Sequence, residues 1–222
     1  MVDARPPVGR TSAGRTTPSH DLNRRSGRTD APRAGTNPHS AANSVAGLVL
    51  AAGAGRRYGG PKAPVFLGQA LRALRDGGCD PLVAVLGAGA HQARSAVDLA
   101  GVHVVDNPLW AAGMSSSLRL GLNTAAGLPG ISAVCVHLVD MPGVTAAAVA
   151  RLLTHTHPGC LARACYDGEP GHPVLLGRDH WAQAAATARG DQGARAYLRL
   201  WADQVSVVEC ADVAAGYDID ER

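Results

Sequence analysis

The sequence predicts an α/β fold in which helices cover both faces of a mostly parallel β-sheet. From Val45 onward, short apolar runs alternate with longer segments of helical character, which is the pattern of such a sheet. The strongest runs are apolar along their whole length, as expected for strands that are buried on both faces. A chain of 222 residues can bury a sizeable core, and one domain is the simplest division.

The first 43 residues differ in composition from the rest. They hold seven Arg and three Asp among many Pro, Gly, Ser and Thr, and they contain few apolar residues. Such a segment cannot bury enough apolar surface to offset the entropy lost on ordering. We therefore predict a disordered tail over residues 1–43 and a folded domain over residues 44–222.

The first half of the domain predicts three strands and three helices in alternation. The strands end in glycines or in Asp106-Asn107-Pro108, and Gly77-Gly78 end the first helix. Serines near the start of the third helix are placed as N-caps. The strands are predicted at 45–50, 81–86 and 102–106, and the helices near 70–76, from 90 to 99 and from 113 onward.

The second half begins with the longest apolar run, residues 131–139, which predicts a strand that ends at Asp140-Met141-Pro142. A helix follows the capping residue Thr145. The remaining predictions are a helix at 144–153, strands near 160–166, 172–176 and 204–208, and helices around 178–187 and 192–201.

Ligands of open α/β sheets bind beyond the carboxyl ends of the strands, so the segments that follow the strands should converge on one crevice. Those segments are Gly53–Lys62, Gly87–Gly89, Asp106–Ser117 and Asp140–Pro142. The first of them is rich in glycine, which lets the backbone approach a ligand and turn its N–H groups toward an anion. It also contains Lys62, the only lysine of the chain.

Two common phosphate-binding loops do not fit this glycine-rich segment. A P-loop needs Gly before the lysine and Ser or Thr after it, whereas Pro61 and Ala63 flank Lys62 here. The dinucleotide-binding fingerprint G-x-G-x-x-G needs its last two glycines to be separated by two residues, whereas three residues separate Gly55 from Gly59. A nucleotidyltransferase loop around a nucleoside triphosphate and a solvent-facing turn remain as alternatives.

Asp140 follows a continuous apolar strand, and Pro142 ends the strand there. Mg²⁺ takes one or two carboxylates together with phosphate oxygens and water. Asp140 is therefore the first candidate metal ligand, and an acid of Asp218-Ile219-Asp220 is the second. The alternative is that Asp140 caps the following turn.

Six motifs in one order across residues 45–220 resemble the molybdenum-cofactor cytidylyltransferase-like family of nucleotidyltransferases. They are Leu50–Lys62, Asn107–Leu118, Asp140-Met141-Pro142, Gly171-His172-Pro173, Gly190–Arg195 and Asp218-Ile219-Asp220. The resemblance implies a Rossmann-like three-layer NTP transferase fold. It also implies an enzyme that moves CMP from CTP to a phosphate-bearing acceptor such as a molybdopterin and releases pyrophosphate.

The resemblance also implies roles for individual residues. Asp140 and Asp220 would bind Mg²⁺, and Lys62, Arg57 and Asp140 would be catalytic. Apart from the resemblance, the position of His172 in an irregular segment between Gly171 and Pro173 favours a substrate contact over packing. Trp110 is expected either to cover the acceptor or to plug the crevice. The nucleotide-binding residues are expected to be Leu50, Ala51, Ala52, Gly53, Gly55, Arg56, Lys62, Ser115 and Asp140.

The composition and the resemblance together suggest partners and location. Beyond residue 43 the chain has fourteen cations and fifteen acids, which argues against nucleic acid as a partner. No apolar stretch is long enough for a membrane span, and five cysteines without C-x-x-C spacing fit a reduced, cytoplasmic protein. The expected partners are a nucleoside triphosphate and a phosphorylated small molecule or cofactor, with a molybdoenzyme or its maturation factor as a further candidate.

Two departures from the family pattern leave alternatives open. Only Ala63–Asp76 is available where the family places a loop, a short strand and most of a helix. The chain reads Asp220-Glu221-Arg222 where the family continues with T-P-E-D. The alternatives are a catalytically impaired nucleotide-binding or accessory paralogue, and a guanylyltransferase of the same fold.

Overall fold

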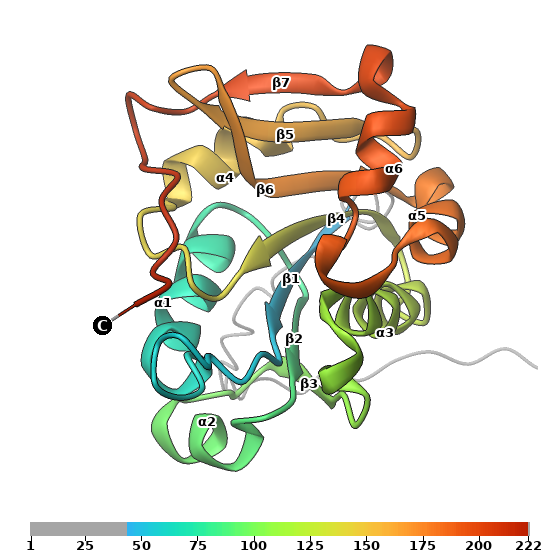
Figure 1. Cartoon of the computed structure of the whole chain (residues 1–222). Helices are drawn as coiled ribbons and strands as arrows, with labels where there is room; N and C mark the ends of the chain where they lie inside the picture. Colours follow the sequence, from blue (N-terminus) through green and yellow to red (C-terminus); the bar gives the residue numbers. More distant parts are fainter. Residues whose placement is uncertain (1–43, 222) are drawn as a thin grey trace, which may run out of the picture. The chain divides into compact units, whose positions relative to one another are not determined.

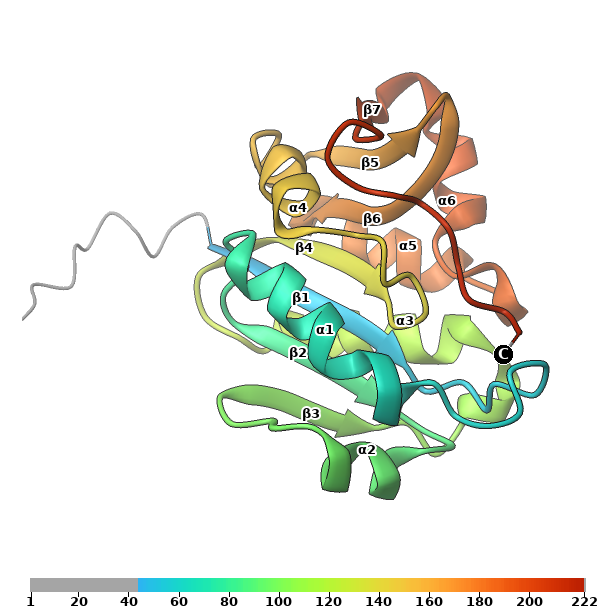
Figure 2. The same ribbon diagram turned by 90° about the vertical axis from the view of Figure 1, so that its left-hand side faces the viewer.

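The computed structural model describes residues 44–221, so the predicted disordered tail over residues 1–43 lies outside the described part of the chain. Residues 44–221 form an α/β arrangement with helices on both faces of one sheet (Figures 1 and 2). The predicted fold class is confirmed. None of the helices in this range is long and apolar enough to cross a membrane.

The sheet has seven strands in the order β3-β2-β1-β4-β6-β5-β7. Strand β1 runs parallel to both β2 and β4, β2 to β3, and β5 to β7, whereas β6 is antiparallel to its neighbours β4 and β5. The strands are β1 (Ser44–Ala51), β2 (Leu82–Leu86), β3 (Val102–Asp106), β4 (Ile131–Leu138), β5 (Leu161–Tyr166), β6 (Glu169–Gly177) and β7 (Ser206–Glu209).

The helices lie on both faces of the sheet (Figures 1 and 2). One apolar cluster packs α1 (Ala63–Asp76), α2 (Ala90–Ala96) and α4 (Ala146–Leu153) against one face. A second cluster packs α3 (Met114–Ala126), α5 (Trp181–Thr187) and α6 (Arg195–Leu200) against the other. Short 3-10 turns span Trp110–Ala112 (η2), Arg178–His180 (η3), Gly190–Gln192 (η4) and Ala202–Gln204 (η5).

Strand β1 shows why its sequence is apolar without alternation. Val45 and Val49 pack in the α1 and α4 cluster, whereas Ala46, Leu48 and Leu50 pack in the α3 cluster. Successive side chains of a strand point to opposite faces, and here both faces are covered by helices. The buried positions of the strand, from Val45 to Ala51, therefore carry no polar side chain.

Helix α1 is longer than predicted, because it begins at Ala63 rather than near residue 70. Lys62 is its N-cap residue and a proline lies in its first turn, a position where the missing N–H costs nothing. The segment Ala63–Asp76, which is shorter than its counterpart in the family, is thus a helix that directly follows residues 53–62, which we call the glycine loop. This arrangement fixes the backbone of Lys62 at a helix start.

Strands β5 and β6 form a hairpin whose turn is Asp167-Gly168. Both turn residues have positive φ, 53° and 85°, as a two-residue type I′ turn requires. Strand β6 therefore begins at Glu169, three residues before the predicted strand at 172–176. An Asp-Gly pair between apolar runs is a hairpin signal, and it was overlooked at this position.

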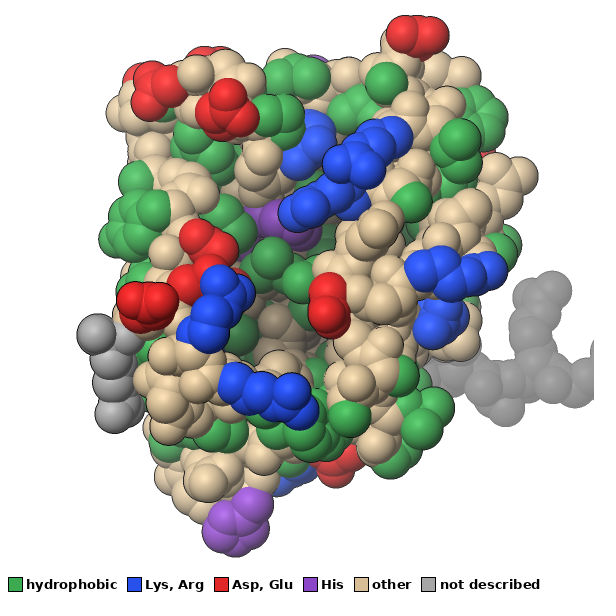
Figure 3. All heavy atoms as spheres, in the orientation of Figure 1, with side chains coloured by type: hydrophobic (Ala, Val, Ile, Leu, Met, Phe, Trp, Pro, Cys, Tyr) green, Lys and Arg blue, Asp and Glu red, His purple; other side chains and the backbone are tan. Residues whose placement is uncertain are grey.

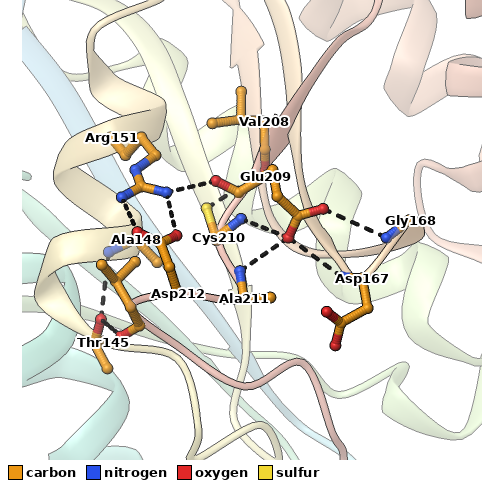
Figure 4. A network of polar contacts seen from close by, with 11 residues as sticks. Thr145, Ala148, Arg151, Asp167, Gly168, Val208, Glu209, Cys210, Ala211 and Asp212 are labelled. Atoms are coloured by element: carbon orange, nitrogen blue, oxygen red, sulfur yellow. Dashed lines mark hydrogen bonds and ion pairs between the residues drawn. The ribbon is translucent and has the colours of Figure 1, made fainter.

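The Glu209 carboxylate ties this hairpin to the end of β7 (Figure 4). It accepts hydrogen bonds from the backbone N–H groups of Asp167, Gly168, Cys210 and Ala211 at 2.9–3.4 Å. These hydrogen bonds, with that of Ala211 contributing most, lower the pKa of Glu209. Nearby, Arg151 of α4 forms a bidentate ion pair with Asp212 (Figure 4).

We predict that Glu209→Gln lowers the melting temperature at neutral pH, because the amide is a weaker acceptor for four N–H groups. The carboxyl pKa is lower in the folded than in the unfolded protein, so its stabilisation is present above the unfolded pKa and disappears as pH falls through the folded one. The difference in melting temperature between wild type and variant should shrink correspondingly in acid. Glu169→Gln, in the same hairpin, is the control and should show no such difference at any pH.

Candidate functional site

Two adjoining cavities open at the carboxyl ends of β1 and β4. Their volumes are about 320 and 410 Å³. Figure 3 shows this face hollowed, with acidic and basic side chains around the hollow. We call the cavity of about 320 Å³ the first cavity and that of about 410 Å³ the second cavity. Both are lined by Leu50, Met114, Leu138, Asp140 and Asp191.

The glycine loop forms one wall of the first cavity. Its backbone folds back on itself, and the N–H of Gly60 donates to the carbonyl of Gly55 at 3.0 Å. Gly55 has φ +58°, and a Cβ there would lie 1.9 Å from the Gly60 carbonyl oxygen. Only glycine fits this position, so this residue gives the loop its shape.

Lys62 joins the loop to two acidic segments. Its Nζ lies 2.9 Å from Asp140 Oδ2 and 3.4 Å from Asp220 Oδ1, and Arg57 Nη1 lies 2.9 Å from Asp220 Oδ2. The Lys62 side chain is only 10% exposed. The N–H of Ile219 also donates to the Asp140 carbonyl at 2.9 Å, so the Asp218-Ile219-Asp220 segment lies along the end of β4.

This arrangement fits a divalent cation. One oxygen each of Asp140 and Asp220 approaches the same ammonium nitrogen, so the two carboxylates converge on one point. Within residues 44–221 no cluster of three or more potential metal ligands is present. Two carboxylates suit Mg²⁺ or Mn²⁺, which take their other ligands from substrate phosphates and water.

Asn107 organises the loop that holds Trp110 over the first cavity. Its side-chain N–H groups donate to the hydroxyls of Ser116 and Ser117 at 2.8 and 2.9 Å, and its Oδ1 accepts from the N–H of Leu109. Asn107 is buried, and its bonds to the two serines are shielded from water. The spacing between the asparagine and the serines in the sequence follows from this network.

The N-terminus of α3 does not have the predicted serine cap. Its N-cap residue is Gly113, with φ +100°, and no side chain at that position bonds to the helix. Instead the carboxylate of Asp191 accepts from the N–H of Met114 at 3.2 Å. A Cβ at Gly113 would lie 2.6 Å from Gly190, so two distant glycine motifs are in direct contact.

The second cavity is lined by His172, Arg163 and Arg195 together with Asp218 and Asp220. The Tyr166 hydroxyl donates to the His172 carbonyl at 2.6 Å. A Cβ at Gly171 would lie 2.7 Å from the Tyr166 ring, which explains the glycine before this histidine. Burial, more than any neighbouring charge, lowers the pKa of His172 to about 4, so its ring is neutral at physiological pH.

Most of the predicted site residues lie in these cavities. Arg57, His172 and Asp220 line the second cavity. Ala51 and Ser115 are buried and line neither, whereas Ser117 lines the first. The predicted residues that line the first cavity are Leu50, Ala52, Gly53, Gly55, Arg56, Lys62, Trp110 and Asp140.

Sequence reasoning did not assign Arg163, Asp191 or Arg195 to the site. Arg163 is the one charged residue in the otherwise apolar run of β5, which was a usable signal. Asp191 and Arg195 belong to a motif that was noted, but no role was given to its side chains.

Comparison with known families agrees with this geometry. Residues 47–207 match the model of the MobA-like NTP transferase domain. The chain belongs to this family. The resemblance found in the sequence is thus confirmed, and MobA-like NTP transferases are nucleotidyltransferases in fold and family.

Individual relatives of this MobA-like chain have diverse names. Nicotine blue oxidoreductase of Paenarthrobacter nicotinovorans is 35% identical over 190 residues, which cover 79% of this chain and 92% of that protein. The Mycobacterium sp. strain JC1 homologue of Rv0371c is 30% identical, with a TM-score of 0.64 over 80% of this chain and 90% of that one. Mycobacterium tuberculosis H37Rv Rv0371c, solved as a complex with manganese, is 28% identical, with a TM-score of 0.60 over 75% and 88%.

We predict that Gly55→Ala weakens nucleoside triphosphate binding by about tenfold or more. A left-handed conformation costs a residue with a Cβ roughly 1–2 kcal/mol, and the clash with Gly60 forces the loop open. Calorimetric titration with triphosphate measures the effect. Gly60→Ala is the control, because a Cβ there meets nothing within 4 Å, and equal losses in both variants would contradict the assigned role of Gly55.

Proposed function

We propose that this protein is a Mg²⁺-dependent cytidylyltransferase that transfers CMP from CTP to a phosphate-bearing acceptor such as a molybdopterin. The observation that carries the proposal is that the two cavities meet at Asp140. A nucleotide in the first cavity and an acceptor in the second would have their reacting groups beside one carboxylate and the Lys62 ammonium.

The chain's own groups supply binding and charge neutralisation. The N–H groups of the glycine loop and the side chains of Arg56 and Lys62 bind the triphosphate, and Arg57 and Lys62 offset the charge that develops at the α-phosphorus. Asp140 and Asp220 would hold the Mg²⁺, which supplies Lewis-acid stabilisation of the phosphoryl oxygens.

The reaction needs no general base from the protein. An acceptor phosphate is already ionised, so its oxygen forms the new bond to the α-phosphorus while the bond from that phosphorus to the bridging oxygen breaks. Pyrophosphate carries away the electron pair. His172 agrees with this scheme, because a ring whose pKa is lowered to about 4 is a poor base. The catalytic contribution is then mainly alignment of the two substrates.

Two observations favour an active enzyme over the impaired paralogue. The short segment after Lys62 forms one continuous helix, and Asp220 still reaches the Lys62 ammonium despite its position near the end of the sequence. Both departures from the family pattern therefore leave the cluster of Lys62, Asp140 and Asp220 assembled.

A second candidate function is an oxidoreductase, favoured by the 35% identity to nicotine blue oxidoreductase. All five cysteines of this chain are buried and unpaired in the structure, so a redox reaction would need an external electron donor such as a reduced nicotinamide dinucleotide. Oxidation of a reduced dinucleotide in the presence of an aromatic dye, without pyrophosphate release from any triphosphate, would establish this alternative instead.

We predict that CTP is used in preference to GTP by roughly 10- to 200-fold. Ala52 lines the first cavity, and its methyl group narrows the slot by about one methylene, a difference worth about 1–3 kcal/mol. Pyrophosphate release with each triphosphate and molybdopterin measures the preference. Ala52→Gly should raise the rate of pyrophosphate release with GTP and leave the rate with CTP nearly unchanged. A preference of the wild-type protein for GTP would reassign the protein as a guanylyltransferase.

We predict that Asp140→Asn weakens Mg²⁺ binding and lowers pyrophosphate release in parallel. Loss of a residue that only supports a metal ligand typically costs about 10- to 100-fold in metal affinity, so loss of a ligand itself should cost at least as much. Titration of Mg²⁺ into the protein with CTP measures the affinity. Asp203→Asn, in the exposed turn η5, is the control. Unchanged Mg²⁺ affinity in Asp140→Asn would favour a turn-capping role for Asp140.

A further inference from the structure

The second cavity has a basic region whose residues have no assigned role in the proposed reaction. Arg163 comes from β5 and Arg195 from the start of α6, and both line this cavity with His172. Figure 3 shows Lys and Arg side chains gathered beside a histidine in the hollow, with acidic side chains on another part of its rim. Arg57, which also lines this cavity, is paired with Asp220, whereas Arg163 and Arg195 come from other elements of its wall.

Neither guanidinium has an ion-pair partner among residues 44–221. Arg163 Nε is buried without a hydrogen-bond partner in this part of the chain, and Arg163 Nη2 makes only a long 3.5 Å bond to the Gly171 carbonyl. Burial, and next the charge of Arg195, lower the pKa of Arg163. Two guanidinium groups that repel each other in a partly buried wall are unfavourable unless an anion neutralises them.

His172 supplies a neutral group beside this pair. Its Nδ1 lies 3.3 Å from the Val136 carbonyl oxygen, which can only accept a hydrogen bond. The Nδ1 atom of the neutral ring therefore carries the proton, and Nε2 is left as an acceptor. The histidine therefore adds no charge beside the two arginines. The carboxylates that line the same cavity belong to Asp140, Asp191, Asp218 and Asp220, and none of them forms an ion pair with either guanidinium.

We propose that Arg163 and Arg195 form a binding subsite for a phosphate monoester group in the second cavity. A phosphate dianion neutralises both guanidinium groups, whereas a carboxylate neutralises one, and the planar fork of arginine matches phosphate oxygens. The inference rests on the proposed function only in naming the acceptor as the molecule that carries this phosphate. It makes the arginine pair the determinant of acceptor specificity.

Inorganic phosphate tests the subsite without nucleotide, metal or acceptor. The melting temperature of the protein is measured across a phosphate titration for wild type, Arg163→Gln, Arg195→Gln and a control, Arg199→Gln. Arg199 lies one turn after Arg195 on α6 and lines neither cavity. We expect wild type and Arg199→Gln to respond alike. Each cavity variant should need about tenfold more phosphate, or more, for the same stabilisation.

A second comparison separates this subsite from the glycine loop, which is also suited to phosphate. Gly55 lines only the first cavity, so Gly55→Ala should keep the part of the phosphate response that the arginine variants lose. Equal responses in all five proteins would overturn the proposal, because phosphate would then bind elsewhere. If the arginine pair binds phosphate but the protein releases no pyrophosphate, the subsite is retained and the proposed transferase function is rejected. If the protein releases pyrophosphate but the arginine pair does not bind phosphate, only the subsite is rejected.

Discussion

The ion cluster around Lys62 is the interaction on which the site depends. One ammonium group, 10% exposed, contacts carboxylates from the end of β4 and from a segment near the end of the sequence. Removing a partly buried cation from two converging carboxylates would leave them to repel each other. The same nitrogen therefore holds the glycine loop, β4 and the Asp218–Asp220 segment together before any ligand binds.

The division of the sheet into two halves explains why there are two cavities. Strands β1 to β4 are mutually parallel where they pair, so their carboxyl ends present the glycine loop and the Trp110 segment along one edge. Strand β6 runs antiparallel to β4 and brings Gly171-His172 to the same edge from the opposite direction. This antiparallel pair forms part of the wall of the second cavity, through Val136 and Leu138 of β4 and His172 and Val174 of β6.

The sequence predicted the parallel half of the fold better than the antiparallel half. Both ends of strand β1 were predicted within one residue, because a short apolar run that ends in glycines is compatible with few structures other than a buried strand. The start of α1 was missed because Lys62-Ala63-Pro64 has no apolar period that marks a helix, whereas the β5–β6 turn was missed although Asp167-Gly168 is a recognisable hairpin signal. Within the site, motif order indicated Lys62, Asp140 and Asp220, whereas the part played by Arg163 depends on strand order, which periodicity does not encode.

The chemistry of the single lysine gives a reason for its identity. An arginine at position 62 would hold one carboxylate with a rigid bidentate fork and would be slow to exchange it. A lysine ammonium is a compact charge on a flexible stem, and here it lies unequally, 2.9 and 3.4 Å, from two carboxylates. If these carboxylates held a divalent cation, as proposed, the ammonium would be free to turn to a phosphate while its helix stayed in place. The loop can thus be ordered without ligand and still change its charge partner on binding.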